Sequence, residues 1–259
     1  MCGRYTLTSA PDVLRALFGY GEQPNFPPRY NIAPTQPIAV VRLVDGKRQF
    51  ALMRWGLLPS WIKDPQALSL IFNARGEGVV DKPAFRAAVR RRRCLIPADG
   101  FYEWKAGAPR KQPYFIHAKS GFPLAFAGLW ETWAGPNGEE LDTAAIVTTA
   151  ASSGLSALHG RVPVIISPEA FGLWLGEGGV EGAADLRAAM ALIRPAPDDL
   201  LEAYPVSTDV NRVANDNPRL LDLLTGTLEA EPPILHKTAR NKGARRPEAN
   251  NAEGQGLLF

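Results

Sequence analysis

The first residues of the chain, Met1-Cys2-Gly3-Arg4-Tyr5, hold the groups with the most distinctive chemistry. Removal of an initiator Met before a small side chain would leave Cys2 with a free α-amine and a thiol on adjacent carbons. An α-amine titrates near ~8 and a thiol near ~8.5, so both have a reactive fraction at neutral pH. A 1,2-aminothiol condenses with an aldehyde to an imine, and the thiol then closes a thiazolidine ring in an intramolecular step. The alternative is that Cys2 is an ordinary small residue at a frayed terminus.

Candidate proton-transfer groups occur where strands are expected to end or turn. Glu103 lies between Tyr102 and Trp104, and a carboxyl group flanked by aromatic rings is partly desolvated, which raises its pKa toward neutrality. His159 is the second candidate, because histidine side chains exchange protons near neutral pH without any perturbation. Each residue also has a structural interpretation, Glu103 as a salt-bridge partner and His159 as a hydrogen-bonded loop residue.

The composition is that of an ordinary globular protein, with 46% hydrophobic and 21% charged residues in 259. This length corresponds to one large domain or two small ones. No apolar run reaches the roughly 20 residues of a membrane span, and no signal-peptide core follows Met1, so we expect no membrane association. The two cysteines, Cys2 and Cys94, suit a reduced cytosolic protein. The scattered histidines lack ligand spacing, so we expect neither a metal nor a cofactor.

Basic residues cluster in one window of twelve residues that contains no acid. The cluster consists of Lys82, Arg86, Arg90, Arg91, Arg92 and Arg93. It could neutralise phosphates, or it could be a solvated helix end that the helix dipole favours, and the sequence leaves both interpretations open.

The pattern of elements predicts an α+β fold with a mainly antiparallel, barrel-like sheet and peripheral helices. Ser9 is expected to cap a helix that runs to Leu17, and 23–36, which is rich in proline, is expected to be a fixed loop. The clearest hairpin is predicted for 38–44 and 49–55, with Asp45-Gly46 as its turn. Further strands are expected at 71–75, 93–97, 100–105, 114–118, 124–133, 143–149, 162–166 and 204–207. Further helices are expected at 82–92, 168–175 and 183–193, with a helical turn at 151–158 and a polar loop at 211–221.

Several long motifs resemble the SRAP (SOS response-associated peptidase) family, in the same order along the chain. They are Cys2-Gly3-Arg4-Tyr5, Arg29-Tyr30-Asn31-Ile32-Ala33-Pro34-Thr35-Gln36, Arg54-Trp55-Gly56-Leu57-Leu58-Pro59, Asn73-Ala74-Arg75, Arg93-Cys94-Leu95-Ile96-Pro97-Ala98-Asp99-Gly100-Phe101-Tyr102-Glu103-Trp104 and His159-Gly160-Arg161-Val162-Pro163. The resemblance runs to about Leu221 and implies a single SRAP domain, which we place at 2–230. One departure is Gly76-Glu77-Gly78, where relatives often have Ala-Glu-Thr or Ser-Glu-Thr.

The resemblance implies a suicide-type DNA repair protein that binds single-stranded DNA and traps abasic sites through a thiazolidine linkage to Cys2. The resemblance also implies roles for three residues: Asn73 holds the N-terminus and the sugar, Glu103 shuttles protons, and His159 helps to open the sugar. Implied DNA contacts are Arg4, Asn31, Trp55, Trp61, Arg75 and Arg161. We expect a DNA-damage-response enzyme with lyase-like or hydrolase-like character, monomeric, cytoplasmic and associated with the nucleoid. A thiol autopeptidase activity that removes Met1 is a further expectation.

The segment 231–259 is rich in Lys, Arg, Asn, Pro and Gly, so we expect a disordered basic tail. It ends in Gln255-Gly256-Leu257-Leu258-Phe259, which resembles the Gln-x-x-Leu-Phe peptides that dock on the bacterial sliding clamp. In such a peptide Gln255 would bond the rim of a pocket that Leu258 and Phe259 fill.

Three other functions remain open on the sequence alone. Glutamine amidotransferases also begin with Met-Cys-Gly, although the chain shows no accompanying oxyanion-hole pattern or synthase domain. A thiol peptidase could use Cys2, Glu103 and His159 as nucleophile and base, although only Met1 precedes the nucleophile. A non-covalent reader of single-stranded DNA would bind equally well without Cys2.

Overall fold

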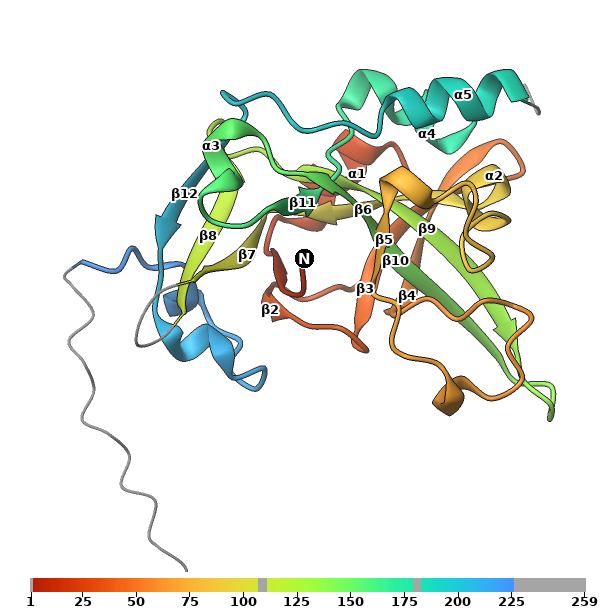
Figure 1. Cartoon of the computed structure of the whole chain (residues 1–259), viewed down its shortest axis with the longest axis horizontal. Coiled ribbons are helices and arrows are strands. Elements are labelled where there is room, and N and C mark those ends of the chain that lie inside the picture. The colour runs from red at the N-terminus through yellow and green to blue at the C-terminus, as the bar shows by residue number, and fades with distance from the viewer. Residues whose placement is uncertain (1, 107–110, 179–182, 226–259) are drawn as a thin grey trace, which may run out of the picture. The chain divides into compact units, whose positions relative to one another are not determined.

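The computed structural model describes residues 2–106, 111–178 and 183–225, and residues Met1–Leu224 form one compact unit (Figure 1). The basic tail and its terminal peptide, with Gln255, Leu258 and Phe259, lie outside the described residues. The predicted α+β class is confirmed, because two sheets dominate and short helices lie beside them. None of the helices in the described ranges is both long and apolar enough to span a membrane.

Five strands close into a barrel. They are β3 (Pro37–Val44), β4 (Lys47–Trp55), β6 (Arg93–Ala98), β9 (Leu124–Ala134) and β10 (Glu140–Ala150). The order β10-β4-β3-β6-β9 is closed by pairing of β9 with β10. All neighbours are antiparallel except β4 and β10, which are parallel. Closure leaves none of these five strands as a free edge, so the barrel is a rigid support for short segments added to its outside.

A second, antiparallel sheet has the order β12-β8-β7-β1-β2 and lies to the left of the barrel strands in Figure 1. Its strands are β1 (Tyr5–Leu7), β2 (Arg29–Ile32), β7 (Gly100–Lys105), β8 (Gln112–Ala118) and β12 (Leu201–Pro205). Only Asp99 separates β6 of the barrel from β7 of this sheet, so the two sheets are covalently joined at a tight corner.

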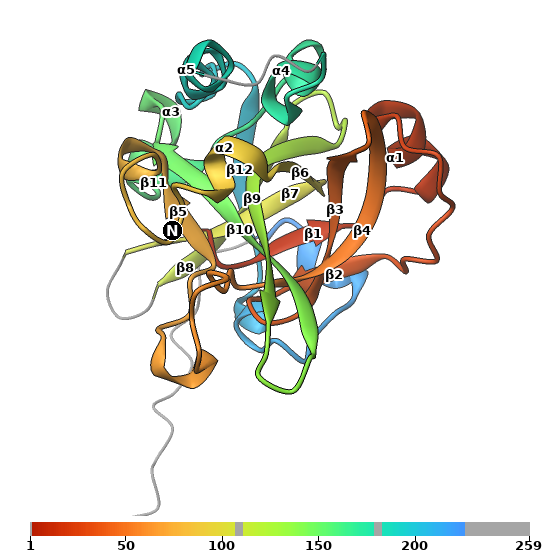
Figure 2. The same ribbon diagram turned by 90° about the vertical axis from the view of Figure 1, so that its right-hand side faces the viewer.

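Two short strands attach to β10 and carry residues of the candidate site. These are β5 (Asn73–Arg75), which pairs in parallel, and β11 (Arg161–Pro163), which pairs antiparallel. The helices are α1 (Pro11–Phe18), α2 (Ala88–Arg91), α3 (Ser153–Ser156), α4 (Phe171–Leu175) and α5 (Ala183–Ala191). Figure 2, turned by 90°, shows α4 and α5 together at one end of the barrel and α1 beside β3 and β4.

Local sequence explains the best-predicted element. Asp45 and Gly46 both have positive φ, 49° and 73°, as the favoured two-residue hairpin turn requires. The register continues from Val44 opposite Lys47 to Pro37 opposite Arg54, confirming the predicted hairpin. Its inward side chains join one large core, in which Tyr5, Trp55 and Phe126 contact edge to face.

Three local predictions were wrong. The N-cap of α1 is Ala10, because the backbone and hydroxyl of Ser9 are bonded to the Asp99 carboxylate instead. The loop 23–36 contains strand β2, since β1 supplies a partner that the prolines do not block. The helix 82–92 shrinks to α2 preceded by isolated turns, and Arg93 donates to the Val89 carbonyl at its C-terminal end.

Candidate functional site

Cys2 lies at the bottom of the site with no exposed surface. The side-chain amide Nδ2 of Asn73 donates to the Cys2 carbonyl oxygen at 2.7 Å. Asn73 is fixed in turn because it is the first residue of β5 and lies opposite Ile146 of β10. Its Oδ1 atom is buried and accepts no hydrogen bond from any residue that the structure describes. The backbone of Cys2 is therefore held by a residue with an unused acceptor beside it.

Glu103 and His159 face each other in this site. Glu103 is on β7, its side chain is 4% exposed, and its Oε1 atom lies 3.9 Å from Nδ1 of His159. Burial raises the pKa of Glu103, and the positive charge that His159 acquires on protonation opposes that shift. A carboxyl group whose pKa is raised holds its proton to higher pH than an ordinary one, which suits it to donate a proton as well as to accept one.

The environment of the Cys2 thiol favours its neutral form. Burial raises the pKa of Cys2, and the nearby negative charge of Glu103 raises it further. Sγ lies 3.8 Å from the carbonyl oxygen of Arg4. The thiol therefore needs a proton acceptor at the moment it reacts, and Glu103 is close enough to influence its titration.

His159 has backbone partners for either protonation state. The amide N–H of Arg161 points at Nδ1 of His159 at 3.0 Å, and the Arg161 carbonyl oxygen lies 2.9 Å from the same atom. Imidazole without a proton on Nδ1 accepts from the amide, whereas imidazole with a proton on Nδ1, neutral or charged, donates to the carbonyl. A proton can thus enter or leave Nδ1 without leaving that atom unbonded.

Arg161 is the most heavily bonded cation near the site. Its two terminal nitrogens donate to the two carboxylate oxygens of Glu77 at 2.9 and 2.8 Å, and Nη2 also donates to the Thr148 carbonyl at 2.7 Å. Arg75, the last residue of β5, is exposed. Thr148 and Glu77 were not among the predicted site residues, although Thr148 could have been noticed as a buried polar residue in the apolar run of β10.

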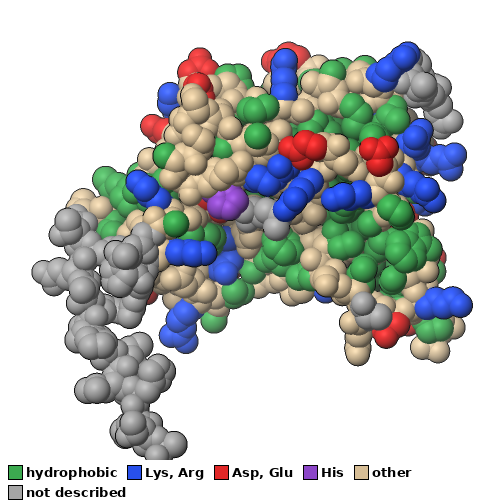
Figure 3. Space-filling view, in the orientation of Figure 1, with side chains coloured by type: hydrophobic (Ala, Val, Ile, Leu, Met, Phe, Trp, Pro, Cys, Tyr) green, Lys and Arg blue, Asp and Glu red, His purple; other side chains and the backbone are tan. Residues whose placement is uncertain are grey.

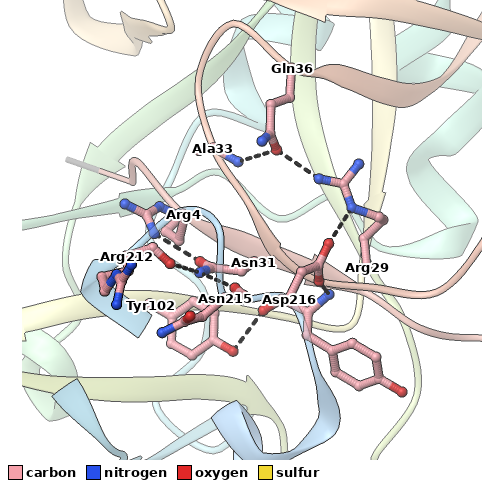
Figure 4. A network of polar contacts seen from close by, with 10 residues as sticks. Arg4, Arg29, Asn31, Ala33, Gln36, Tyr102, Arg212, Asn215 and Asp216 are labelled. Atoms are coloured by element: carbon pink, nitrogen blue, oxygen red, sulfur yellow. Dashed lines mark hydrogen bonds and ion pairs between the residues drawn. The ribbon is translucent and has the colours of Figure 1, made fainter. Parts of the chain in front are cut away.

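Asn31 lies in the network of polar contacts shown in Figure 4. It is fully buried, its Oδ1 accepts from Arg4 at 2.8 Å, and its Nδ2 donates to the carbonyls of Arg212 and Asn215 at 3.0 and 2.7 Å. Burial and these internal bonds occupy the whole side chain of Asn31, and its contact with DNA stays a prediction. Arg4 also donates to the Val210 carbonyl at 2.7 Å, so one of its nitrogens anchors a loop.

Trp55, the last residue of β4, and Trp61 have opposite environments. Trp55 is 0% exposed, and its ring packs against Tyr5 and Phe72 while Nε1 donates to the Phe72 carbonyl. The indole of Trp55 therefore fills the core, and its predicted contact with DNA stays a prediction. Trp61 is 58% exposed and remains a candidate for stacking on a base.

Basic side chains gather on the face of the molecule drawn in Figure 3, on both sides of a histidine. Not every residue of the basic cluster contributes, since Arg93 is buried against Asp185 and Arg92 is paired with Glu131. In the part of the chain that the structure describes, no three His, Cys, Asp or Glu side chains converge as ligands of a metal ion would.

Comparisons with known proteins agree with this architecture. The family model for SOS response associated peptidase (SRAP) matches residues 1–213. The abasic site processing protein YoqW of Bacillus subtilis is 38% identical over 226 residues, covering 86% of this chain and 99% of the relative. The abasic site processing protein HMCES of Gallus gallus is 33% identical, covering 85% and 77%. The chain belongs to the SRAP family.

Solved structures show the same fold. A protein from Bacteroides thetaiotaomicron superposes with a TM-score of 0.76 at 23% identity, covering 86% of this chain and 100% of that one. A phage-related protein from Bordetella bronchiseptica superposes with a TM-score of 0.62 at 33% identity, covering 79% and 94%.

Proposed function

We propose that this protein processes abasic sites in DNA by capturing them covalently on Cys2. Relatives that share most of its length are named abasic site processing proteins. The observation that carries the proposal is the Asn73 bond to the Cys2 carbonyl, which fixes the first residues beside the buried Glu103 and His159. An aminothiol fixed beside two proton-transfer groups is suited to condensation with an aldehyde.

Once Met1 has been removed, the proposed capture takes three steps: opening of the sugar, imine formation and closure of the thiazolidine. In the closed sugar the bond from C1′ to the ring oxygen breaks, the oxygen gains a proton from His159, and the C1′ hydroxyl loses one to give the aldehyde. The α-amine of Cys2 then adds to C1′, and loss of one water leaves an imine. Finally Sγ adds to C1′ while its proton passes, through Glu103, to the imine nitrogen, which closes the thiazolidine.

The structure favours single-stranded DNA as the substrate. Cys2 has no exposed surface, so an abasic sugar has to leave the line of the strand to reach it. Extruding a nucleotide costs least where no partner strand and little stacking hold it. Exposed Arg75 and Trp61 supply a phosphate contact and a stacking surface for the flanking nucleotides.

The burial of Cys2 argues against a thiol peptidase that cuts other proteins. A peptidase nucleophile is a thiolate reached by a polypeptide, and here burial and Glu103 both raise the pKa of the thiol. The same argument applies to glutamine hydrolysis by Cys2. A non-covalent reader would have no use for the Asn73 bond to the Cys2 backbone.

The decisive experiment is intact mass spectrometry after incubation with single-stranded DNA that carries one abasic site. We expect an adduct equal to protein without Met1 plus DNA minus one water, and complete loss of this adduct in Cys2→Ala. Cys94→Ala is the matched control, because Cys94 is the other buried cysteine and should retain the adduct. Failure of the Met1-free wild-type protein to form any adduct would overturn the proposal.

A further inference from the structure

The basic cluster at 82–93 separates into two groups in the folded chain. Arg92 pairs with Glu131, and Arg93 pairs with Asp185, so these two cations are engaged within the fold. The other four are exposed, and none of their side chains makes an ion pair or a hydrogen bond to any residue that the structure describes. These four are Lys82, Arg86, Arg90 and Arg91.

Three of the four follow one another at a spacing of four residues. The amide of Arg86 donates to the Lys82 carbonyl at 2.9 Å, and the amide of Val89 donates to the Phe85 carbonyl at 2.9 Å, so the chain turns helically before α2 begins. In such turns residues four apart lie on the same side, separated by about 6 Å along the axis. Phe85 and Val89 pack into the core, whereas the cations face solvent. We call Lys82, Arg86 and Arg90 the basic row.

The helix dipole does not explain the basic row. A helix stabilises cations within its last turn and disfavours them at its start. Lys82 and Arg86 lie before the first residue of α2, at the disfavoured end. Like charges four residues apart also repel each other, and the adjacent Asp81 forms an ion pair with none of the described residues. The fold therefore gives no reason for the row, and its charges are available to an external anion.

The row begins beside the segment that holds Cys2. Asn73, whose side chain binds the Cys2 carbonyl, is the first residue of β5, and Arg75 is its exposed last residue. The turn that follows β5 ends at Gly78, whose carbonyl accepts from the Lys82 amide at 3.1 Å. On the face drawn in Figure 3, Lys and Arg side chains continue from the histidine toward the side where Figure 1 places α2. A long anion that passes over Cys2 and Arg75 would therefore reach the row.

The chemistry of this surface fits the backbone of DNA and not its bases. Proteins that hold single-stranded bases combine cations with aromatic rings on which the bases stack. Among the described residues, none of the large exposed apolar side chains lies between 76 and 92, so this surface offers charge alone. Lys and Arg side chains that contact phosphates add affinity and fix the register of the DNA without reading its sequence.

We propose that Lys82, Arg86 and Arg90 bind phosphates of the DNA on one side of the abasic site, beyond the nucleotides next to the captured sugar. This inference rests on the proposed function for the identity of the anion. The row adds affinity and sets the direction in which one flank of the DNA leaves the site, while the chemistry stays with the residues around Cys2. Because the row lies on one side only, it makes the two flanks of an abasic site unequal.

The test compares two triple variants. The basic-row variant carries Lys82→Gln, Arg86→Gln and Arg90→Gln. The matched control carries three substitutions of cations on α1, on the β3–β4 hairpin and after β8, which also form no ion pair with the described residues: Arg15→Gln, Lys47→Gln and Lys119→Gln. Both variants lose three positive charges, so a general weakening of attraction to DNA would be alike in both. The Tm of each should stay close to that of the wild-type protein, because all six side chains lie outside the core.

The first measurement is the affinity of the full chain for a long, intact single strand as a function of salt. Each phosphate contact on a single strand contributes about 0.7 to the slope of log affinity against log salt. We expect the slope to fall by about 2 in the basic-row variant, with about a 10- to 100-fold loss of affinity at ~0.1 M salt, and less than about a threefold loss in the control. An unchanged slope in the basic-row variant, or an equal change in the control, would overturn the proposal.

The second measurement is the rate of adduct formation at limiting protein, on strands extended only to the 5′ side or only to the 3′ side of the abasic site. We expect the basic-row variant to react about tenfold more slowly on one of these strands and less than about twofold more slowly on the other. Equal slowing on both would overturn the one-sided placement. If wild-type protein forms no adduct while the basic-row variant binds intact DNA more weakly, the proposed function fails and the row is supported. Normal adduct formation with unchanged DNA binding in the basic-row variant would have the opposite meaning.

Discussion

Two asparagines, Asn31 fully buried and Asn73 partly buried, differ in how completely their polar atoms are bonded. Asn31 uses its oxygen and its nitrogen, bonding Arg4 on one side and the carbonyls of the 210–215 loop on the other (Figure 4). Asn73 uses its nitrogen on the Cys2 carbonyl, and its buried oxygen accepts nothing from the described residues. Buried polar groups are normally satisfied, and what distinguishes the unused oxygen of Asn73 is that the same side chain holds the backbone of Cys2.

The surroundings of Asn31 consist of paired polar groups, whereas those of Asn73 contain groups whose pKa is shifted by burial. Near Asn31, Asp216 pairs with Arg29, and the Gln36 side chain accepts from Arg29 and from the Ala33 amide. Near Asn73, a buried carboxyl group has its pKa raised by desolvation, and a thiol is kept neutral. The first region is arranged for stability, and the second retains groups that cost stability and are available for chemistry.

Replacing Glu103 tests the buried carboxyl group in the region around Asn73. Glu103→Gln should lower the rate of adduct formation by about 10²–10⁴-fold, since proton transfer by a positioned carboxyl group contributes that much. Single-turnover assays on the Met1-free protein measure it. Retention of the wild-type rate would show that Glu103 is only a structural residue.

The same variant should be more stable than the wild-type protein at neutral pH. Because burial raises the pKa of Glu103 in the folded state, the folded protein binds the proton more tightly than the unfolded chain does. Stability therefore decreases as the pH rises from the ordinary carboxyl pKa through the raised one, and the cost is complete above it. Glu103→Gln should remove this cost, so its Tm advantage should grow from acid to neutral pH.

Replacing Asn73 tests the hydrogen bond that its side chain donates to the Cys2 carbonyl. Asn73→Ala frees the Cys2 carbonyl, and we expect about a 10²-fold decrease in adduct rate because the amine is no longer oriented. Its Tm should change little, since the side chain makes only one hydrogen bond to the residues that the structure describes. Thermal melting and adduct kinetics on the same sample separate the two effects.

Replacing Asn31 should give the reverse result. Asn31→Ala removes a fully buried side chain from several hydrogen bonds, so the free energy of unfolding should fall by about 2–4 kcal/mol. Adduct formation per folded molecule, measured well below the Tm, should stay within a few-fold of wild type. A selective loss of rate in Asn31→Ala would remove the distinction between the regions.

The sequence predicted the parts of the fold that are decided locally. Asp45-Gly46 is sufficient for its hairpin because the turn requires two positive φ angles. The segment 82–92 has a helical pattern, but only α2 forms, since the packing of Phe85 and Val89 on the barrel is not visible in that pattern. Strand β2 depends on a partner near the start of the chain, which local rules do not consider.

The resemblance of its motifs to a known family predicted the site, whereas the chemistry of single residues predicted only part of it. The sequence indicated Cys2, Asn73, Glu103 and His159, and the structure brings them together. It could not distinguish Trp55 from Trp61, because the two tryptophans look alike until Trp55, at the end of β4, is seen in the core. The motifs also did not indicate that Glu77 pairs with Arg161, because this contact forms only in the folded chain.

The barrel brings residue 2 and residue 159 into one site, and this has a consequence for timing during synthesis. At about 5–20 residues per second, β11 leaves the ribosome roughly 10–30 s after the first residues do. Throughout that interval Cys2 lacks Glu103, His159 or both, and the core that finally encloses it is incomplete. If the initiator Met is removed, as the proposed chemistry requires, this interval is when an aminopeptidase has access, and folding afterwards shields the aminothiol from stray aldehydes.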